Sequence, residues 1–234
     1  MKALILAAGT GSRLGALTTD RPKAVVPVGG IPLLARVLAW LAHPAVTAVG
    51  CVGGFAADLL FREARRARPD IACFHNPRFL DGNIESLFAA RSFFDDTVLL
   101  MNADHLYRPK ILERVLANDR DVTAVCDFDR RLTPDDMKIV RAADGRLRAI
   151  QKTLTHYDGG YIGMTLIPRV HCNAYWAAAE QTRAACGASA GVEQILGTLA
   201  AQDHPVAICD VSGIGWAEVD TPEDLAAAER FVAA

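Results

Sequence analysis

The chain has 234 residues, of which 51% are hydrophobic and 22% are charged. This composition is that of a globular protein in water, and the length suits one large domain with a core of its own. The 25 Lys and Arg residues nearly balance the 27 Asp and Glu residues. The balance leaves no broad basic surface, so nucleic acid and anionic membranes are not expected partners.

The sequence shows no sign of export or membrane insertion. No apolar run reaches spanning length, and a strand pattern follows directly on Met1 and Lys2. We therefore expect a cytoplasmic protein without a signal peptide or an inserted segment. The cysteines are scattered, without a CxxC pair, which predicts buried, reduced thiols rather than disulfides or a zinc site. They are Cys51, Cys73, Cys126, Cys172, Cys186 and Cys209.

Strand-like and helix-like segments alternate through the first half of the chain. Strands are expected at Ala3–Ala7, Val46–Val52, Ile71–Phe74, Val98–Met101 and Val122–Cys126, with a short edge segment at Ala24–Val28. Helices are expected between them at Pro32–His43, Ala56–Arg68, Ile84–Ser92 and Pro109–Ala117. Such alternation predicts a parallel, doubly wound sheet with right-handed crossovers.

The order of elements changes after Asp127. An Asp-Gly turn between two short strands, Lys138–Arg141 and Leu147–Ile150, predicts a β-hairpin. Further strands are expected at Tyr161–Ile167 and Val206–Val211, and helices at Arg169–Cys186, Val192–Gln202 and Pro222–Ala233. The expected fold class is α/β: one domain, residues 1–234, with a Rossmann-like, doubly wound, mixed but mostly parallel sheet and a small β-hairpin insertion.

The first strand breaks into a glycine turn with features of a phosphate-binding loop. We expect Gly9 and Gly11 to adopt positive φ, so that the backbone approaches a ligand and successive amides face an anion. Arg13, Arg21 and Lys23 add positive charge within the same loop. An ordinary turn followed by a solvated basic loop is the alternative that this stretch alone leaves open.

Two related phosphate-binding motifs do not fit this turn. A P-loop would end in Gly-Lys-Ser/Thr, and no such ending follows. In the Rossmann fingerprint the third glycine position would be Leu14, and no acidic ribose partner is easily placed. A Walker-type NTPase and a dinucleotide-binding protein are therefore disfavoured.

Two acidic residues follow predicted strands and complement the basic loop. Asp104 comes after a buried strand, at the edge where open α/β sheets bind ligands. Asp220 precedes the last helix, where an N-cap role is the competing interpretation. Carboxylates at such positions are ligands that Mg²⁺ prefers beside phosphates. Together with the glycine turn and Lys23, they indicate Mg²⁺-assisted attack on a nucleoside triphosphate.

With these residues assembled, the chain resembles the nucleotidyltransferases that make nucleotide-activated sugars, polyols and amino alcohols. The N-terminal signature lies in Leu6–Arg13 and Arg21–Lys23. Within that superfamily the chain is most similar to the CTP-using inositol-1-phosphate and phosphocholine cytidylyltransferases. The segments that carry this similarity are Gly82–Leu87, Met101–Tyr107, Asp136–Val140 and Val219–Leu225.

The resemblance implies a role for each matching residue. The nucleotide would contact Leu6, Ala7, Ala8, Gly9, Gly11, Arg13, Lys23, Asn83, Ser86 and Asn102. Of these, Asn83 and Ser86 would lie near the base and help to select cytosine. Lys23 would neutralise the phosphates with help from Arg13, and Asp104 and Asp220 would bind Mg²⁺. Lys152 would provide a cation for the acceptor phosphate.

The implied reaction is direct in-line attack by an acceptor phosphate oxygen on the α-phosphorus of CTP, which releases pyrophosphate. A phosphate monoester is already anionic, so positioning and charge stabilisation suffice, and His105 is more readily a structural residue than a base. Residues 1–126 are expected to bind the nucleotide and residues 127–234 the acceptor.

The expected partners are CTP and a small phosphorylated acceptor, and a homodimer stays open. We favour a polyol phosphate of the inositol 1-phosphate type, to which Glu193 would offer a polar contact. The alternatives are phosphocholine, a phosphonate such as 2-aminoethylphosphonate, and guanylyl or uridylyl transfer to a sugar 1-phosphate. A non-catalytic nucleotide sensor is the alternative from another class.

Overall fold

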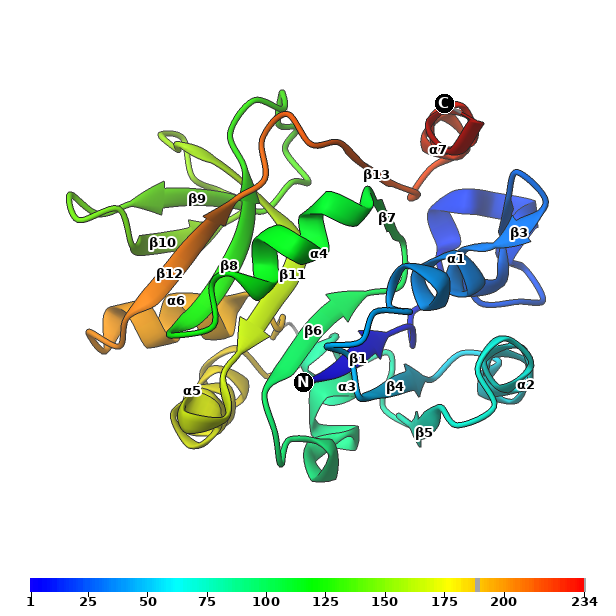
Figure 1. Ribbon diagram of the computed structural model, residues 1–234, viewed down its shortest axis with the longest axis horizontal. Helices are drawn as coiled ribbons and strands as arrows, with labels where there is room; N and C mark the ends of the chain where they lie inside the picture. Colours follow the sequence, from blue (N-terminus) through cyan, green and yellow to red (C-terminus); the bar gives the residue numbers. More distant parts are fainter. Residues whose placement is uncertain (188–189, 234) are drawn as a thin grey trace.

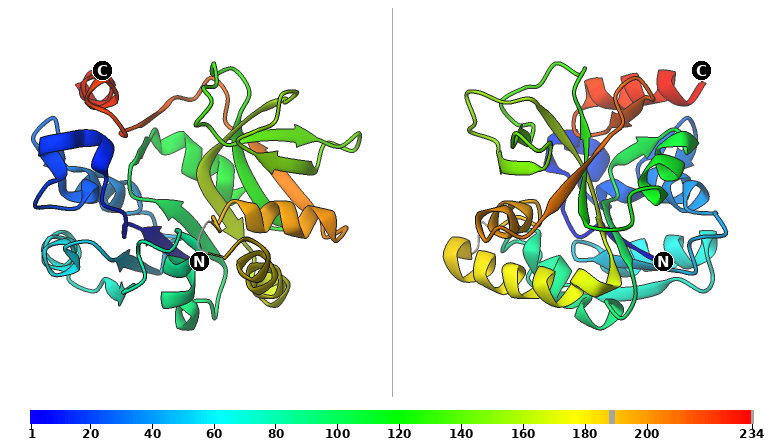
Figure 2. Two further views of the ribbon diagram at one scale, coloured as in Figure 1. Left: turned by 180° about the vertical axis from the view of Figure 1, so that it is seen from behind. Right: turned by 60° about the vertical axis from the view of Figure 1, so that its left-hand side comes forward.

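The computed structural model describes residues 1–187 and 190–233. Within these residues one nine-stranded sheet forms the centre of the molecule, with helices on both faces (Figures 1 and 2). Its strands are β1 (Lys2–Leu6), β4 (Ala48–Gly53), β5 (Ala72–His75), β6 (Val98–Asn102), β8 (Val122–Asp127), β9 (Lys138–Arg141), β10 (Leu147–Gln151), β11 (Gly159–Ile167) and β12 (Val206–Asp210). The expected α/β class and β-hairpin are confirmed.

The N-terminal strand β1 occupies the middle of the sheet. It runs parallel to β4 on one side and β6 on the other, and Leu6 is paired with both Val52 and Asn102. Ala3 to Leu6 are buried because helices cover both faces of a parallel sheet. β1, β4 and β6 therefore end at one edge, and the loops that follow β1 and β6 lie side by side there.

Strand β11 is the main departure from the simple parallel order predicted for the first half of the chain. It enters between β6 and β8 and is antiparallel to both. A register shift between Tyr161 and Thr165 lets this one long strand also pair with β9. The sheet is therefore mixed, as the expected fold class states.

Seven α-helices in the described part of the chain cover the sheet: α1 (Leu33–Trp40), α2 (Ala57–Ala67), α3 (Ile84–Ala89), α4 (Pro109–Leu116), α5 (Cys172–Cys186), α6 (Gln194–Ala201) and α7 (Pro222–Ala233). One core contains Val37 of α1 and Ile111 of α4, and the core of the opposite face contains Leu87 of α3 and Leu196 of α6. The predicted helices are confirmed with shifted ends. No described helix is both long and apolar enough to cross a membrane.

Two short antiparallel ribbons were not expected from the sequence. β2 (Pro27–Val28) pairs with β3 (Ile31–Pro32), and the segment predicted as one edge piece begins instead with the 3₁₀ turn η2 (Lys23–Val25). β7 (His105–Tyr107) pairs with β13 (Trp216–Glu218). The β7–β13 ribbon joins two segments that are far apart in the sequence, directly beside the predicted acidic residues.

A buried ion pair connects α3 to α5. Glu85 of α3 is 6% exposed and accepts two hydrogen bonds from Arg183, at 2.6 and 2.7 Å. Bidentate geometry makes this a strong charge-assisted contact. Because Glu85 is adjacent to Ser86, the pair fixes the helical turn that carries one of the predicted nucleotide contacts.

Removing Arg183 should be costly, because the buried carboxylate of Glu85 then keeps only the exposed Arg78, at 3.2 Å, as a cation within the described residues. We expect Arg183→Ala to lower the free energy of unfolding by about 2 kcal/mol, a value at the lower end because Arg183 is partly exposed. Chemical denaturation measures this change. Arg66→Ala removes an exposed arginine at 3.9 Å from Glu63 and should have no measurable effect. Equal losses in the two variants would contradict the assignment.

Candidate active site

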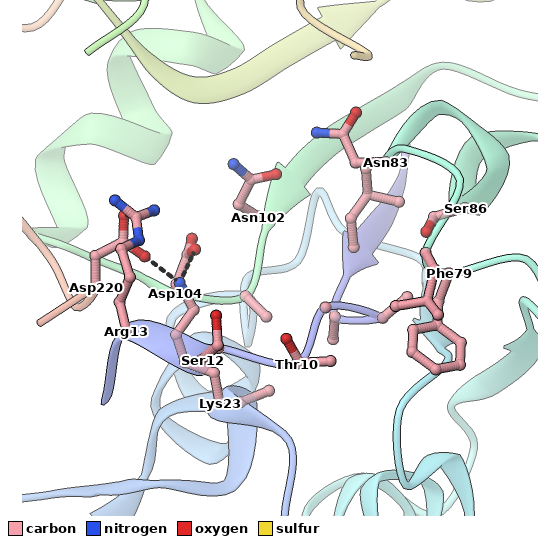
Figure 3. Close-up of a pocket in the computed structure, with 18 of the residues that line it drawn as sticks. Thr10, Ser12, Arg13, Lys23, Phe79, Asn83, Ser86, Asn102, Asp104 and Asp220 are labelled. Carbon is pink, nitrogen blue, oxygen red and sulfur yellow. Dashed lines mark hydrogen bonds and ion pairs between the residues drawn. The ribbon is translucent and has the colours of Figure 1, made fainter. Parts of the chain in front are cut away.

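A cavity of about 470 Å³ opens at the carboxyl ends of β1 and β6. This is the size and place expected of a ligand site in an open α/β sheet. Every residue predicted to contact the nucleotide lines it: Leu6, Ala7, Ala8, Gly9, Gly11, Arg13, Lys23, Asn83, Ser86 and Asn102. Asp104 and Asp220 line it as well. Figure 3 shows the charged side chains gathered at one end and Ser86 with Phe79 at the other.

The glycine turn differs from expectation at one of its two glycines. Gly11 has φ +68°, as predicted, and a Cβ added there would lie 2.6 Å from Cβ of Lys23. Gly9, in contrast, does not adopt positive φ, and a Cβ added there would meet open space. Gly11 therefore allows the lysine to pack against the loop, whereas Gly9 leaves room in the cavity.

Lys23 lies between two carboxylates. Its Nζ donates to Oδ2 of Asp104 at 2.6 Å and to Oδ1 of Asp220 at 2.5 Å. The three side chains are only 16–18% exposed. Burial alone would lower the pKa of Lys23, but the charges of Asp104 and Asp220 outweigh it and raise that pKa. Likewise burial opposes ionisation of Asp104, but Lys23 and His105 hold its pKa well below the usual range.

The other cations of the loop have different surroundings. Arg13 is about half exposed and donates to Asp220 at 2.7 Å and to Asp135 at 3.5 Å. Arg13 lines the cavity. Because its side chain is already about half exposed, it can turn toward a ligand with little loss of buried surface. Arg21 pairs with Asp20 at 2.9 Å and does not line the cavity, although the sequence grouped it with Arg13 and Lys23.

The β7–β13 ribbon sets the spacing of the two acidic residues. Asp104 directly precedes β7 and Asp220 follows β13, and the amide of Val219 donates to the carbonyl of Asp104 at 2.9 Å. Asp220 is not the N-cap of α7, the alternative that the sequence left open. Thr221 takes that role: its Oγ1 accepts from the amide of Asp224 at 3.2 Å, while its own amide donates to the Asp224 carboxylate at 2.9 Å.

His105 braces Asp104 from behind. Its Nδ1 lies 2.6 Å from Oδ1 of Asp104, and its ring is nearly parallel to those of Tyr107 and Trp216, with centroids 5.8 and 5.5 Å away. Burial alone would lower the pKa of His105, but the Asp104 carboxylate outweighs burial and raises that pKa. Because it is 4% exposed and packed against two aromatic rings, the imidazole is well placed to orient the carboxylate.

The chemistry of Asp104 and Asp220 fits a divalent cation. Both carboxylates already converge on one positive group, the ammonium of Lys23, which marks the position that a cation would take between them. Oxygen ligands beside a phosphate loop are those that Mg²⁺ uses. Asp104, His105 and Glu218 also lie within 4.8 Å of one another, but the imidazole is already hydrogen-bonded to Asp104.

A second cavity, of about 450 Å³, adjoins the first and shares Arg13, Lys23, Asn83, Asn102, Asp104 and Asp220 with it. The two predicted acceptor contacts, Lys152 and Glu193, line this second cavity. The side-chain amide of Asn83, which lines both cavities, donates to Glu193 of the second cavity at 3.4 Å.

Sequence reasoning missed several residues that line the two cavities. Arg130 lies over the ring of Trp216 at 4.4 Å and faces the second cavity together with Tyr161. Phe79 lines the first cavity beside Ser86. These positions carry no spacing signal, because they come from loops and from a strand whose partners only the folded chain defines.

The fold is that of an α/β protein with two adjoining cavities at the carboxyl edge of its sheet. Residues 3–209 match the family of MobA-like NTP transferase domains, and the chain belongs to this family. The superfamily resemblance seen in the sequence is thereby confirmed.

Curated relatives match nearly the whole chain. It is 30% identical over 98% of its length to the bifunctional IPC transferase and DIPP synthase of Rubrobacter xylanophilus, of which it covers 51%. It is 32% identical over 96% of its length to the CMP-5'-(3-aminopropyl)phosphonate synthase of Streptomyces rubellomurinus, of which it covers 37%. The chain thus spans about half or less of the length of these relatives.

Two solved structures share the fold. The inositol-1-phosphate CTP transferase from T. maritima has a TM-score of 0.84 at 19% identity, covering 98% of this chain and 96% of that one. The CTP:phosphocholine cytidylyltransferase from Streptococcus pneumoniae has a TM-score of 0.79 at 18% identity, covering 99% of this chain and 98% of that one. At these identities the likeness shows the fold.

The two glycines of the loop offer a matched test. Gly11→Ala should lower the melting temperature, because it forces an L-residue to positive φ and collides with Lys23. We expect a loss of about 1–2 kcal/mol for that strain. Gly9→Ala should leave the melting temperature unchanged but weaken nucleotide binding, which calorimetry measures. Normal binding in Gly9→Ala would contradict a close approach of the nucleotide to this turn.

Proposed function

We propose that the protein is a nucleotidyltransferase that transfers CMP from CTP to a small acceptor bearing a phosphate or a phosphonate, with release of pyrophosphate. The observation that carries this proposal is the buried ion-pair cluster of Lys23, Asp104 and Asp220, which lines the same cavity as the glycine turn. The relatives named for CMP or CTP chemistry support the choice of nucleotide.

Each cavity has its own role in this proposal. The first cavity binds CTP, with its triphosphate at the charged end and its base between Ser86 and Phe79. The second cavity binds the acceptor, with its phosphate toward Lys152 and Arg130. Residues 1–126 supply most nucleotide contacts and residues 127–234 most acceptor contacts. Asp220 is the exception, since it joins the nucleotide cavity from the second half of the chain.

The chemistry needs charge stabilisation more than proton transfer. The acceptor oxygen is already anionic, so it attacks the α-phosphorus in line while pyrophosphate leaves on the opposite side. Lys23 and Arg13 are placed to neutralise the negative charge of the triphosphate as it shifts to the leaving group. A divalent cation, when bound by Asp104 and Asp220, would add to this neutralisation.

Two acceptor classes remain in view. The sequence favours a polyol phosphate such as inositol 1-phosphate. An aminoalkylphosphonate is the second candidate, because Glu193 is a carboxylate at the second cavity that could receive an ammonium group. The two relatives at about 30% identity, with their different names, do not favour one class over the other.

A pyrophosphate-release screen tests the proposal. CTP, UTP, GTP and ATP are each supplied with Mg²⁺ and inositol 1-phosphate, phosphocholine, 2-aminoethylphosphonate or a sugar 1-phosphate. We expect release with CTP and at least one of these acceptors, and little without an acceptor. Absence of release across the whole panel would contradict the proposal, and release with GTP alone would overturn the choice of base.

Two substitutions test the assigned residues. Lys23→Ala and Asp104→Ala should each lower kcat/KM by at least about a hundredfold, as is common when a charge-stabilising group is lost. Lys110→Ala, which removes an exposed lysine of α4, is the control and should retain wild-type activity. Circular dichroism checks that each variant is folded. A folded Lys23→Ala enzyme with normal kcat/KM would exclude the assigned role.

A further inference from the structure

Asn76 is a buried polar residue beneath the nucleotide cavity to which no role has yet been assigned. It directly follows β5 and is 1% exposed. Its backbone amide donates to the carbonyl of Gly53 at 2.8 Å, which ties the loop that follows β5 to the end of β4. A buried side-chain amide needs partners for both of its ends.

The orientation of the Asn76 side-chain amide is fixed by the donor and acceptor groups that surround it. Its Oδ1 lies 2.8 Å from the backbone nitrogen of Arg78, which can only donate a hydrogen bond. The other terminal atom is therefore the NH₂ group, and it lies 3.0 Å from Oγ of Ser86. A flipped amide would place a donor against a donor, so only this assignment satisfies both contacts.

This orientation determines what Ser86 offers to a ligand. Ser86 is 2% exposed and lines the cavity, and its Oγ accepts from Asn76. An amide nitrogen cannot accept, so the hydroxyl proton of Ser86 must point elsewhere. Within residues 1–187 and 190–233, no protein acceptor for that proton is found, and the cavity lies beside it.

The surroundings of Ser86 suit the flat face of a base. Phe79 lines the same end of the cavity (Figure 3). It fits there because position 54 is glycine: a Cβ at Gly54 would lie 2.4 Å from Cβ of Phe79. An aromatic ring beside a single oriented donor is a suitable arrangement for stacking a base and reading its edge.

We propose that Asn76 is a positioning residue for base selection, which holds the Ser86 hydroxyl as a donor toward a ring-nitrogen acceptor of the base. Cytosine presents such an acceptor at N3, whereas uracil carries a hydrogen there. The Asn76–Ser86 pair thus favours CTP over UTP. This inference rests on the proposed function of the cavity as a CTP site and adds the group that sets the polarity of its base contact.

Asn76→Asp reverses this polarity with almost no change in shape. An ionised carboxylate still accepts from the amide of Arg78, but it also accepts the proton of Ser86, which then faces the cavity as an acceptor only. We expect CTP binding to weaken at least about tenfold, the scale of one lost hydrogen bond in a buried site. The preference for CTP over UTP should fall toward unity.

Titration calorimetry with CTP and with UTP, each with Mg²⁺ and without acceptor, measures these changes at pH 8. Ser86→Ala removes only the hydroxyl oxygen and should lose the same preference, which keeps the test decisive if Asn76→Asp fails to fold. In the Ser86→Ala background, Asn76→Asp should change CTP affinity less than about twofold, since its effect passes through Ser86. Asn173→Asp, at an exposed position of α5, is the control for the added charge.

The outcomes separate this inference from the proposed function. If wild-type protein prefers CTP and both Asn76→Asp and Ser86→Ala keep that preference, the inference is wrong and the CTP site stands. If the two substitutions weaken CTP and UTP binding equally, or act additively, Asn76 is merely structural and the inference is again wrong. If the wild-type protein does not bind CTP, both proposals fail.

Discussion

The shared cation between Asp104 and Asp220 is the interaction on which the site depends. Two carboxylates that approach the same ammonium group repel each other, and they would be costly to bury without that positive group between them. Lys23 supplies that group, and it comes from the N-terminal loop, whereas the acids come from the ends of two other segments. Two ion pairs that share Lys23 thus join three distant parts of the chain at the open edge of the sheet.

The same arrangement would allow Lys23 to exchange its carboxylate partners for the phosphates of a nucleotide. If Asp104 and Asp220 held a divalent cation, the ammonium of Lys23 would be free to pair with the phosphates of a nucleotide. The surrounding structure restrains the other members: the β7–β13 ribbon holds the two acids, and His105 orients Asp104. The lysine packs against Gly11.

The sequence predicts most of the sheet, because buried strands and their turns have clear periodicity. It predicts Asp104 because an acid that follows a buried strand lies at the ligand-binding edge, and Asp220 through the family resemblance and the complementary basic loop. It does not predict the β7–β13 ribbon, since strands of three residues carry no periodic pattern. The place of β11 depends on pairings with distant strands. Gly9 was wrongly expected at positive φ, because residue type alone does not fix a glycine's conformation. The roles of Asn76 and Arg130 could not be predicted, because they depend on contacts that form only in the folded chain.

We propose that Asp104 and Asp220 would hold a divalent cation at the position that the ammonium of Lys23 occupies. Electron paramagnetic resonance of Mn²⁺ bound to the nucleotide-free protein tests it most directly, with Lys23→Met compared to wild type and Lys110→Met as the charge control. Lys23→Met should bind Mn²⁺ at least about tenfold more tightly, because the competing ammonium is gone and the two carboxylates keep only Arg13 and His105 as partners in the described part of the chain. Equal or weaker Mn²⁺ binding by Lys23→Met would contradict the account.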